Sequence, residues 1–233
     1  MNDAAVALFA KRPIPGRVKT RLVPPLSHED AARVARASLE DTARLIATQV
    51  PAPWTLFLDG EPDRATRQLA QETNLRIALQ EGPELGARLK AAFQTLRAGG
   101  ARRVLAIGSD SPTLDPERIR EAFESLALCD LALGPTEDGG YYLIGTSGQH
   151  ESIFDGIPWG SAATAATTLE RAREGALGVR LLAPWYDLDD AESLRRAYEA
   201  APRSGSALRE VLEGLKEKLE FVSRPASDFR SPA

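Results

Sequence analysis

The sequence has few of the residues on which several classes of protein depend. Its 233 residues include one cysteine, Cys129, which excludes a disulfide framework and a cysteine-rich metal site. There are two histidines, His28 and His150, so a metal centre built from several histidines is excluded as well. We expect both histidines at the surface, and we expect Cys129 to be buried as a small apolar side chain.

Long apolar runs and an excess of basic charge are also missing. No apolar run approaches the ~20 residues that a membrane-spanning helix needs. The run over 4–10 follows Asp3 and precedes Lys11 and Arg12, which reverses the charge order of a signal peptide. The 29 Lys and Arg against 33 Asp and Glu give a net charge of −4 and a pI near 5.4. Without a basic tract, this balance argues against nucleic-acid binding, so we expect a cytoplasmic protein without nucleic-acid or membrane partners.

The apolar pattern is typical of an α/β protein. Hydrophobic residues make up 43% of the chain, enough for a full core, and the length fits one large domain. Strand-like runs are expected over 4–10, 54–58, 75–79, 104–108, 131–133, 141–144 and 179–183. Helices are expected from Ser27, over 61–73 and 87–96, from Asp115-Pro116, over 162–174, after 190 and over 208–219. The apolar face of the last helix is expected to pack against the sheet or a partner in a homodimer. The sequence predicts one domain over 1–223 and a disordered tail, rich in Ser and Pro, over 224–233.

A basic loop follows the first expected strand. Five cations fall within residues 11–21 of an otherwise acidic chain: Lys11, Arg12, Arg17, Lys19 and Arg21. Open α/β sheets bind ligands beyond the carboxyl ends of their strands, and clustered Lys and Arg there suit a di- or triphosphate. The loop is not a Walker A motif, because a valine stands where that motif needs its second glycine. A solvated basic loop without a ligand is the alternative.

Carboxylates follow two of the expected strands. Asp110 comes directly after the strand over 104–108, where a carboxylate can bring Mg²⁺ to a phosphate, although it could simply cap a turn. Asp187 and Asp189 flank Leu188, and strand-like alternation would point both carboxylates to one side. If this segment folds back toward Asp110, it supplies the second carboxylate of a metal site. Asp189-Asp190 is equally typical of an ordinary helix N-cap.

Three further segments could contact a ligand. Asp138-Gly139-Gly140 lies between two apolar runs and is typical of a hairpin turn, but two glycines also allow a close backbone approach to a ligand. Glu137 and Asp138 then become candidates for an acid, a base or a group that orients the acceptor. The loop over 82–88 could contact a nucleobase or be a plain turn into a helix. Trp159 could stack on a ring, although a core position is favoured.

Taken together, these segments resemble a known family. The segments are 9–22 (FAKRPIPGRVKTRL), 108–113 (GSDSPT), 134–145 (GPTEDGGYYLIG) and 157–159 (IPW), and the resemblance covers about residues 4–200. They occur in the same order in radical-SAM/selenodomain-associated transferases of the glycosyltransferase-A fold, often labelled arsenosugar biosynthesis glycosyltransferases. The segment KTRL is also similar to 2-phospho-lactate guanylyltransferase. One departure is PIPG in place of the Gly-rich loop that opens the superfamily's sugar nucleotidyltransferases.

The resemblance implies a nucleotide-diphospho-sugar transferase fold, a three-layer α/β sandwich with a mixed, mostly parallel central sheet. It assigns nucleotide binding to Lys11, Arg12, Gly16, Arg17, Lys19, Arg21, Gly82, Leu85, Gly86, Arg88, Ser109 and Asp110. It places Asp138, Gly139 and Gly140 near the acceptor, and we add Glu137 and Trp159 from the interpretation above as acceptor-binding candidates. It makes Asp110 the main ligand of Mg²⁺ or Mn²⁺, with Asp187 or Asp189 completing the site. The expected catalytic residues are Lys19, Asp110 and Asp138.

Two reactions share these residues. Nucleotidyl transfer from a nucleoside triphosphate to a small phosphorylated acceptor mainly needs positioning and neutralisation of charge, which the five cations and an aspartate metal site would provide. Glycosyl transfer from a nucleotide-diphosphate sugar to a small-molecule hydroxyl would also need a base on the acceptor, for which Glu137 or Asp138 is the evident choice. The basic loop favours nucleotidyl transfer. A non-catalytic protein that binds a nucleotide or a sugar phosphate is the third alternative.

Overall fold

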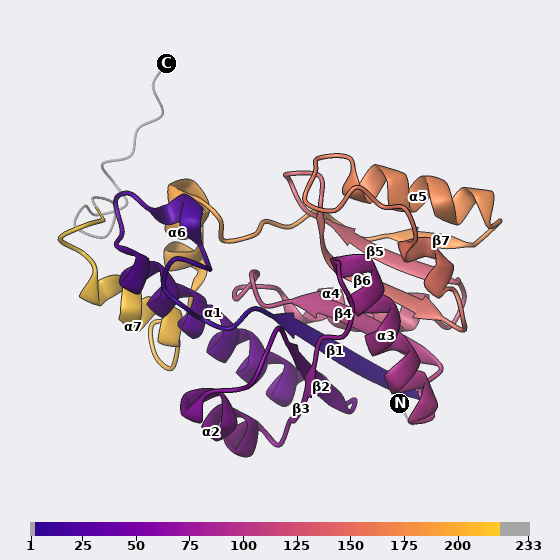
Figure 1. The fold of residues 1–233 in the computed structure, drawn as a ribbon, viewed down its shortest axis with the longest axis horizontal. Helices are drawn as coiled ribbons and strands as arrows, with labels where there is room; N and C mark the ends of the chain where they lie inside the picture. Colours follow the sequence, from indigo (N-terminus) through magenta and orange to yellow (C-terminus); the bar gives the residue numbers. More distant parts are fainter. Residues whose placement is uncertain (1–2, 220–233) are drawn as a thin grey trace.

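The computed structural model describes residues 3–219 and consists of one sheet covered by helices (Figure 1). Within that range the strand order is β3-β2-β1-β4-β6-β5-β7. The strands are β1 (Ala4–Ala10), β2 (Trp54–Leu58), β3 (Arg76–Leu79), β4 (Arg103–Gly108), β5 (Leu131–Pro135), β6 (Tyr141–Ser147) and β7 (Val179–Leu181). Among these, β6 runs antiparallel to its neighbours β4 and β5, and the other pairings are parallel. The expected mixed, mostly parallel sheet is therefore confirmed.

The helices begin close to where the sequence indicates, and two of them begin at the expected caps, Ser27 and Asp115. They are α1 (His28–Gln49), α2 (Arg64–Thr73), α3 (Leu85–Ala98), α4 (Pro116–Ser125), α5 (Thr164–Glu174), α6 (Ala191–Ala200) and α7 (Ala207–Gly214), with 3-10 turns at Thr20–Leu22 and Glu151–Phe154. Ser27 caps α1 by accepting a hydrogen bond from the backbone N–H of Asp30 at 3.1 Å. Asp115 caps α4, whose first residue is Pro116. No helix within residues 3–219 is both long and apolar enough to cross a membrane.

Alternating side chains of the central strand divide the core into two layers. Val6 and Leu8 of β1 pack in a cluster with the apolar faces of α1, α2 and α4. Ala7 packs in a second cluster with α3 and α5 on the other face of the sheet (Figure 1). The first strand is apolar throughout because both of its faces are covered, as the sequence predicts. This arrangement is the expected three-layer sandwich.

The last helix packs differently from what its apolar face suggests. Leu208 and Leu212 of α7 lie in a third cluster with the N-terminal half of α1 and with α6, beside rather than on the sheet (Figure 1). Asp41 of α1 fixes this contact, because its carboxylate accepts hydrogen bonds from the hydroxyl of Ser206 and from the backbone N–H groups of Ala207 and Leu208 at 2.8–3.0 Å. The tail expected over 224–233 lies outside the described residues.

Candidate active site

The candidate site lies where the strand order reverses. β1 has β2 on one side and β4 on the other, so the chain winds outward from β1 in both directions. Ligands of open α/β sheets bind at the carboxyl ends of the strands at such a reversal. Here the loop after β1 and the residues after β4 line a cleft of about 710 Å³. The fold thus brings together two segments that the sequence places about 90 residues apart.

Lys19 is the centre of the site. Its Nζ lies 2.6 Å from Asp110 Oδ1 and 3.4 Å from Asp189 Oδ1, and its side chain is only 3% exposed. Burial opposes the charge on this ammonium, but the carboxylates of Asp110, Asp189 and Asp187 outweigh burial and hold the pKa of Lys19 above its ordinary value. Lys19 also has a left-handed backbone, with φ of 48°, which a non-glycine residue adopts at a cost of about 1–3 kcal/mol. The surrounding contacts therefore hold Lys19 in place as a buried cation.

The segment after β7 folds back to Asp110, as one of the two interpretations of the sequence requires. The backbone N–H of Leu188 donates to the carbonyl oxygen of Asp110 at 2.9 Å, and Ser111 Oγ donates to Asp187 Oδ1 at 2.8 Å. Leu188 is fully buried, while Asp187 and Asp189 both line the cleft, so the expected alternation is confirmed. The helix cap is the next residue, Asp190, which accepts from the backbone N–H of Ser193 at 2.8 Å and completes a capping box. Capping and cleft lining are thus divided among neighbouring aspartates.

The carboxylates fit a divalent cation that is shared with a substrate. No three Asp, Glu, His or Cys side chains in the described range 3–219 are clustered so as to hold a metal ion on their own. Mg²⁺ is often bound by one or two carboxylates together with phosphates, and Asp110 and Asp187 offer suitable oxygen atoms. Burial, followed by the nearby Asp110 carboxylate, raises the pKa of Asp187 to about 6. A cation between Asp110 and Asp187 would relieve the repulsion between their negative charges, so their chemistry suits Mg²⁺ or Mn²⁺. Metal binding by these two residues stays a prediction.

Cations cover the wall of the cleft that the basic loop forms. Four of the five loop cations line it, namely Lys11, Arg17, Lys19 and Arg21, and Arg88 joins them from α3. The expected nucleotide residues Leu85, Ser109 and Asp110 line it too. The fifth loop cation, Arg12, turns away: its backbone N–H donates to Asp59 Oδ1 at 2.7 Å, and its Nε lies 3.6 Å from the same oxygen. Arg12 thus anchors the loop to the end of β2.

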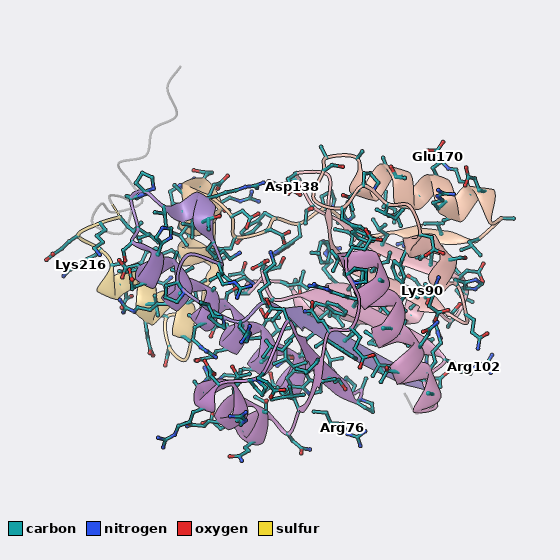
Figure 2. The ribbon with its side chains drawn as sticks, viewed as in Figure 1. Arg76, Lys90, Arg102, Asp138, Glu170 and Lys216 are labelled. Atoms are coloured by element: carbon teal, nitrogen blue, oxygen red, sulfur yellow. The ribbon has the colours of Figure 1, made fainter. Side chains whose placement is uncertain are left out.

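The opposite wall carries a single carboxylate among polar and aromatic groups. Three of the residues expected to bind the acceptor, Asp138, Gly140 and Trp159, line the cleft, with Tyr141 and Ser161 beside them. Trp159, for which a core position was favoured, also packs, partly buried, against the second core cluster. Asp138 Oδ1 accepts hydrogen bonds from the Thr136 hydroxyl at 2.6 Å and the Gly140 N–H at 3.2 Å, and these lower the pKa of Asp138. Figure 2 shows Asp138 far from Lys90 of α3. Asp138 therefore both forms the expected hairpin turn and lines the cleft.

Several expected residues support the site from outside the cleft. Glu137 forms a two-point ion pair with Arg196 at 2.8 and 3.0 Å, so its carboxylate is engaged with α6. A Cβ on Gly139, whose φ is +91°, would lie 2.2 Å from the carbonyl oxygen of Ala162, and one on Gly86 would lie 2.8 Å from the Trp159 indole nitrogen. These glycines allow close packing of the walls. The remaining two expected residues that do not line the cleft are Gly16 and Gly82.

Gln80 is a cleft residue that sequence reasoning missed. Its Nε2 donates to the carbonyl oxygens of Ala10 and Phe57 at 3.0 and 2.9 Å, which ties the ends of β1 and β2 together. Its Oε1 accepts from Arg88 Nη1 at 3.4 Å. A polar residue directly after the strand over 75–79 was the available signal. Thr20 and Thr164 also line the cleft, and nothing in their local sequence marks them.

Comparisons with known proteins identify the family of this chain and structures with a similar fold. Residues 42–161 match a family model described as "Uncharacterized protein conserved in bacteria (DUF2064)", which is just over half of the chain. A search of curated proteins finds no significant match. Among solved structures, one from Desulfovibrio desulfuricans G20, named as a candidate nucleotide-diphospho-sugar transferase, is 30% identical. The alignment covers 95% of this chain and 99% of that chain, with a TM-score of 0.84.

More distant structures share the fold. CMP:2-keto-3-deoxy-manno-octonic acid synthetase complexed with CTP is 12% identical over 84% of this chain and 97% of that chain, with a TM-score of 0.52. Rv0371c of Mycobacterium tuberculosis H37Rv in complex with manganese is 17% identical over 86% of this chain and 100% of that chain, with a TM-score of 0.51. At these identities the likeness establishes the fold alone.

Proposed function

This chain belongs to the DUF2064 family, and we propose that it is a metal-dependent transferase that moves a nucleotidyl group from a nucleoside triphosphate to a small phosphorylated acceptor. An oxygen of the acceptor phosphate attacks the α-phosphorus, the bond to the β-phosphate breaks, and pyrophosphate leaves. The observation that carries the proposal is the cation wall, in which Lys11, Arg17, Lys19 and Arg21 face one cleft beside Asp110. Phosphoryl-type transfer depends mainly on such positioning and charge neutralisation.

The proposal gives the cleft residues separate roles. Lys19 and Arg17 bind the phosphates of the donor, while Gln80 and Arg88 lie near its base. Asp110 and Asp187 hold Mg²⁺ or Mn²⁺. We choose Asp187 over Asp189 as the second ligand because Asp189, unlike Asp110 and Asp187, also pairs with Arg21, whose Nη1 lies 3.4 Å from its carboxylate. The cation supplies charge neutralisation to the leaving pyrophosphate when it is bound. The name of the 30% identical neighbour and the CTP bound to the distant one support a nucleotide donor.

A thermal-shift panel with Mg²⁺ tests the proposal. It compares the four common nucleoside triphosphates with UDP-, GDP- and other nucleotide sugars and with the bare diphosphates. A ligand at ~100 times its dissociation constant stabilises the folded state by about 2.7 kcal/mol. That corresponds to a rise of roughly 5–11 °C in Tm for a domain of this size. A Tm shift that is specific to one triphosphate and is lost when the metal is chelated supports the proposal. If none of the four triphosphates shifts Tm, the proposal is overturned.

A second candidate, glycosyl transfer to a hydroxyl, is favoured by one observation. Asp138 is an exposed carboxylate on the wall that carries Trp159, and such a carboxylate can accept a proton from an acceptor hydroxyl. The narrower resemblance to radical-SAM/selenodomain-associated transferases points the same way. A larger shift with a nucleotide sugar than with its diphosphate would favour this candidate. Binding without release of pyrophosphate or of a nucleoside diphosphate, whichever acceptors are supplied, would leave a non-catalytic binding protein.

A further inference from the structure

The place where a cation would bind Asp110 is taken by a side chain of the protein itself. Lys19 Nζ lies 2.6 Å from Asp110 Oδ1, which is hydrogen-bond distance, and the same ammonium contacts Asp189. Because the Lys19 side chain is buried, its charge is little screened by water. The free protein therefore already neutralises the carboxylate that the proposed function assigns to the metal.

We propose that Lys19 keeps Asp110 closed to free divalent cations, and that Asp110 opens when the phosphates of the nucleotide draw the ammonium away. This inference rests on the proposed function and adds a regulatory step to the same site. Under it, metal and nucleotide bind together, while metal alone binds weakly. Lys19 serves first as the counter-ion of Asp110 and then as a phosphate ligand.

The neighbouring groups allow this exchange. Lysine carries its ammonium on a flexible four-carbon stem, so Nζ can move while the backbone stays in place. The Asp110 side chain is 52% exposed, which leaves it accessible from the cleft once Lys19 withdraws. Asp189 would keep a positively charged partner after Lys19 leaves, because Arg21 Nη1 lies 3.4 Å from Asp189 Oδ2. Departure of Lys19 therefore uncovers one carboxylate and leaves the next one paired.

The exchange of Lys19 between Asp110 and phosphate can be measured as a change in metal affinity, without turnover. If phosphate binding frees Asp110, each ligand raises the affinity for the other by the same factor. Removing the ammonium should abolish the competition, so that metal binds tightly without nucleotide. A purely structural role of Lys19 predicts no gain in metal affinity.

The experiment titrates the full-length protein with Mn²⁺ in the absence of nucleotide, with electron paramagnetic resonance as the readout of free ion. Lys19→Met, which keeps the length of the side chain and removes its charge, should bind Mn²⁺ about tenfold more tightly than the wild type, or better. Lys19→Arg retains the charge and should stay close to the wild type. Lys11→Met removes an exposed cation of the same cleft, and Lys90→Met removes a cation of α3 that pairs with Asp155 outside the cleft; neither variant should show the gain.

Equal Mn²⁺ affinities of folded Lys19→Met and the wild type would overturn the inference. A second comparison needs no Lys19 variant. In the absence of nucleotide, the Mn²⁺ affinities of the wild type and of Asp110→Asn should agree within about twofold, because Lys19 closes Asp110 in the free protein. Clear loss of Mn²⁺ binding in Asp110→Asn would show an open Asp110 and also overturn it. The thermal-shift panel decides the proposed function separately, since absence of nucleotide binding there leaves the metal-only comparison intact.

Discussion

Asp110→Asn distinguishes a binding role of the Asp110 carboxylate from a structural one. A hydrogen bond between charged groups contributes about 1.5–3 kcal/mol when it is buried. The exposure of the Asp110 side chain reduces this toward the ~1 kcal/mol of exposed pairs. The substitution also removes the charge that repels Asp187, which acts in the opposite direction. We expect the free energy of unfolding of the ligand-free protein to fall by about 1 kcal/mol or less, and Tm by up to about 4 °C.

The effect on ligand-bound protein should be much larger. If Asp110 holds the cation that accompanies the nucleotide phosphates, the variant loses the stabilisation of about 2.7 kcal/mol that a saturating triphosphate provides. The rise of roughly 5–11 °C expected for the wild type should then disappear. A small loss in the free protein and a near-complete loss of the ligand effect together identify a binding residue.

Differential scanning fluorimetry with and without triphosphate and Mg²⁺ measures both quantities in one plate. The matched control is Asp190→Asn, which changes a nearby aspartate that caps α6. Asparagine is itself a good N-cap residue, so this variant should keep the ligand-induced shift. The reasoning is refuted if Asp110→Asn shows the full wild-type shift, because a carboxylate that holds the cation cannot be dispensable for it.

Three further substitutions test the surrounding structure. Gly139→Ala places a methyl group against the carbonyl oxygen of Ala162 at a φ of +91°, so urea denaturation should show a loss of at least about 2 kcal/mol, and an unchanged midpoint would contradict the close approach. The Lys218 ammonium, by its hydrogen bond, lowers the pKa of Asp30 below its value in the unfolded chain. The stability that Asp30 contributes is therefore present above about pH 4 and lost as the pH falls through the folded-state pKa. In urea denaturation, the loss in free energy of unfolding caused by Asp30→Asn should shrink on acidification. A loss that stays constant with pH would argue against the ion pair. Asp41→Ala removes the acceptor at the start of α7 and should cost about 1–2 kcal/mol, whereas a neutral result would mean that α7 docks through its leucines alone.

Local sequence patterns were enough to predict the first strand, two helix caps and the alternation of the aspartates that line the cleft. The run over 4–10 is a strand with the expected bounds because both faces of β1 are covered, and that requirement is written in its continuous apolarity. Ser27 and Asp115 cap helices because the cap contacts residues two or three positions further on. The alternation of Asp187, Leu188 and Asp189 is likewise local, so their division between cleft and core could be predicted.

Long-range pairing decided what could not be predicted. Arg12 stands among four cations that line the cleft, and its difference from them lies in Asp59, 47 residues away. Glu137 was a candidate for the acceptor site, but Arg196 of α6 engages its carboxylate. The apolar face of α7 predicted packing against the sheet or a homodimer partner, but within this chain it packs with α1 and α6. In each case the deciding contact joins segments far apart in the sequence, and nothing in either segment's local sequence indicates its partner.

The distribution of charge in the free protein orders the proposed binding events. In the loop over 11–21, Arg12 and Lys19 contact carboxylates at close range, whereas Arg17 and Lys11 are exposed at the cleft. Exposed cations attract a polyanion over about a Debye length, and this attraction weakens as salt is added. A buried, paired ammonium can respond only after the phosphates have arrived. The phosphates would therefore meet Arg17 and Lys11 first and Lys19 last, which is the order required if nucleotide arrival is to open Asp110.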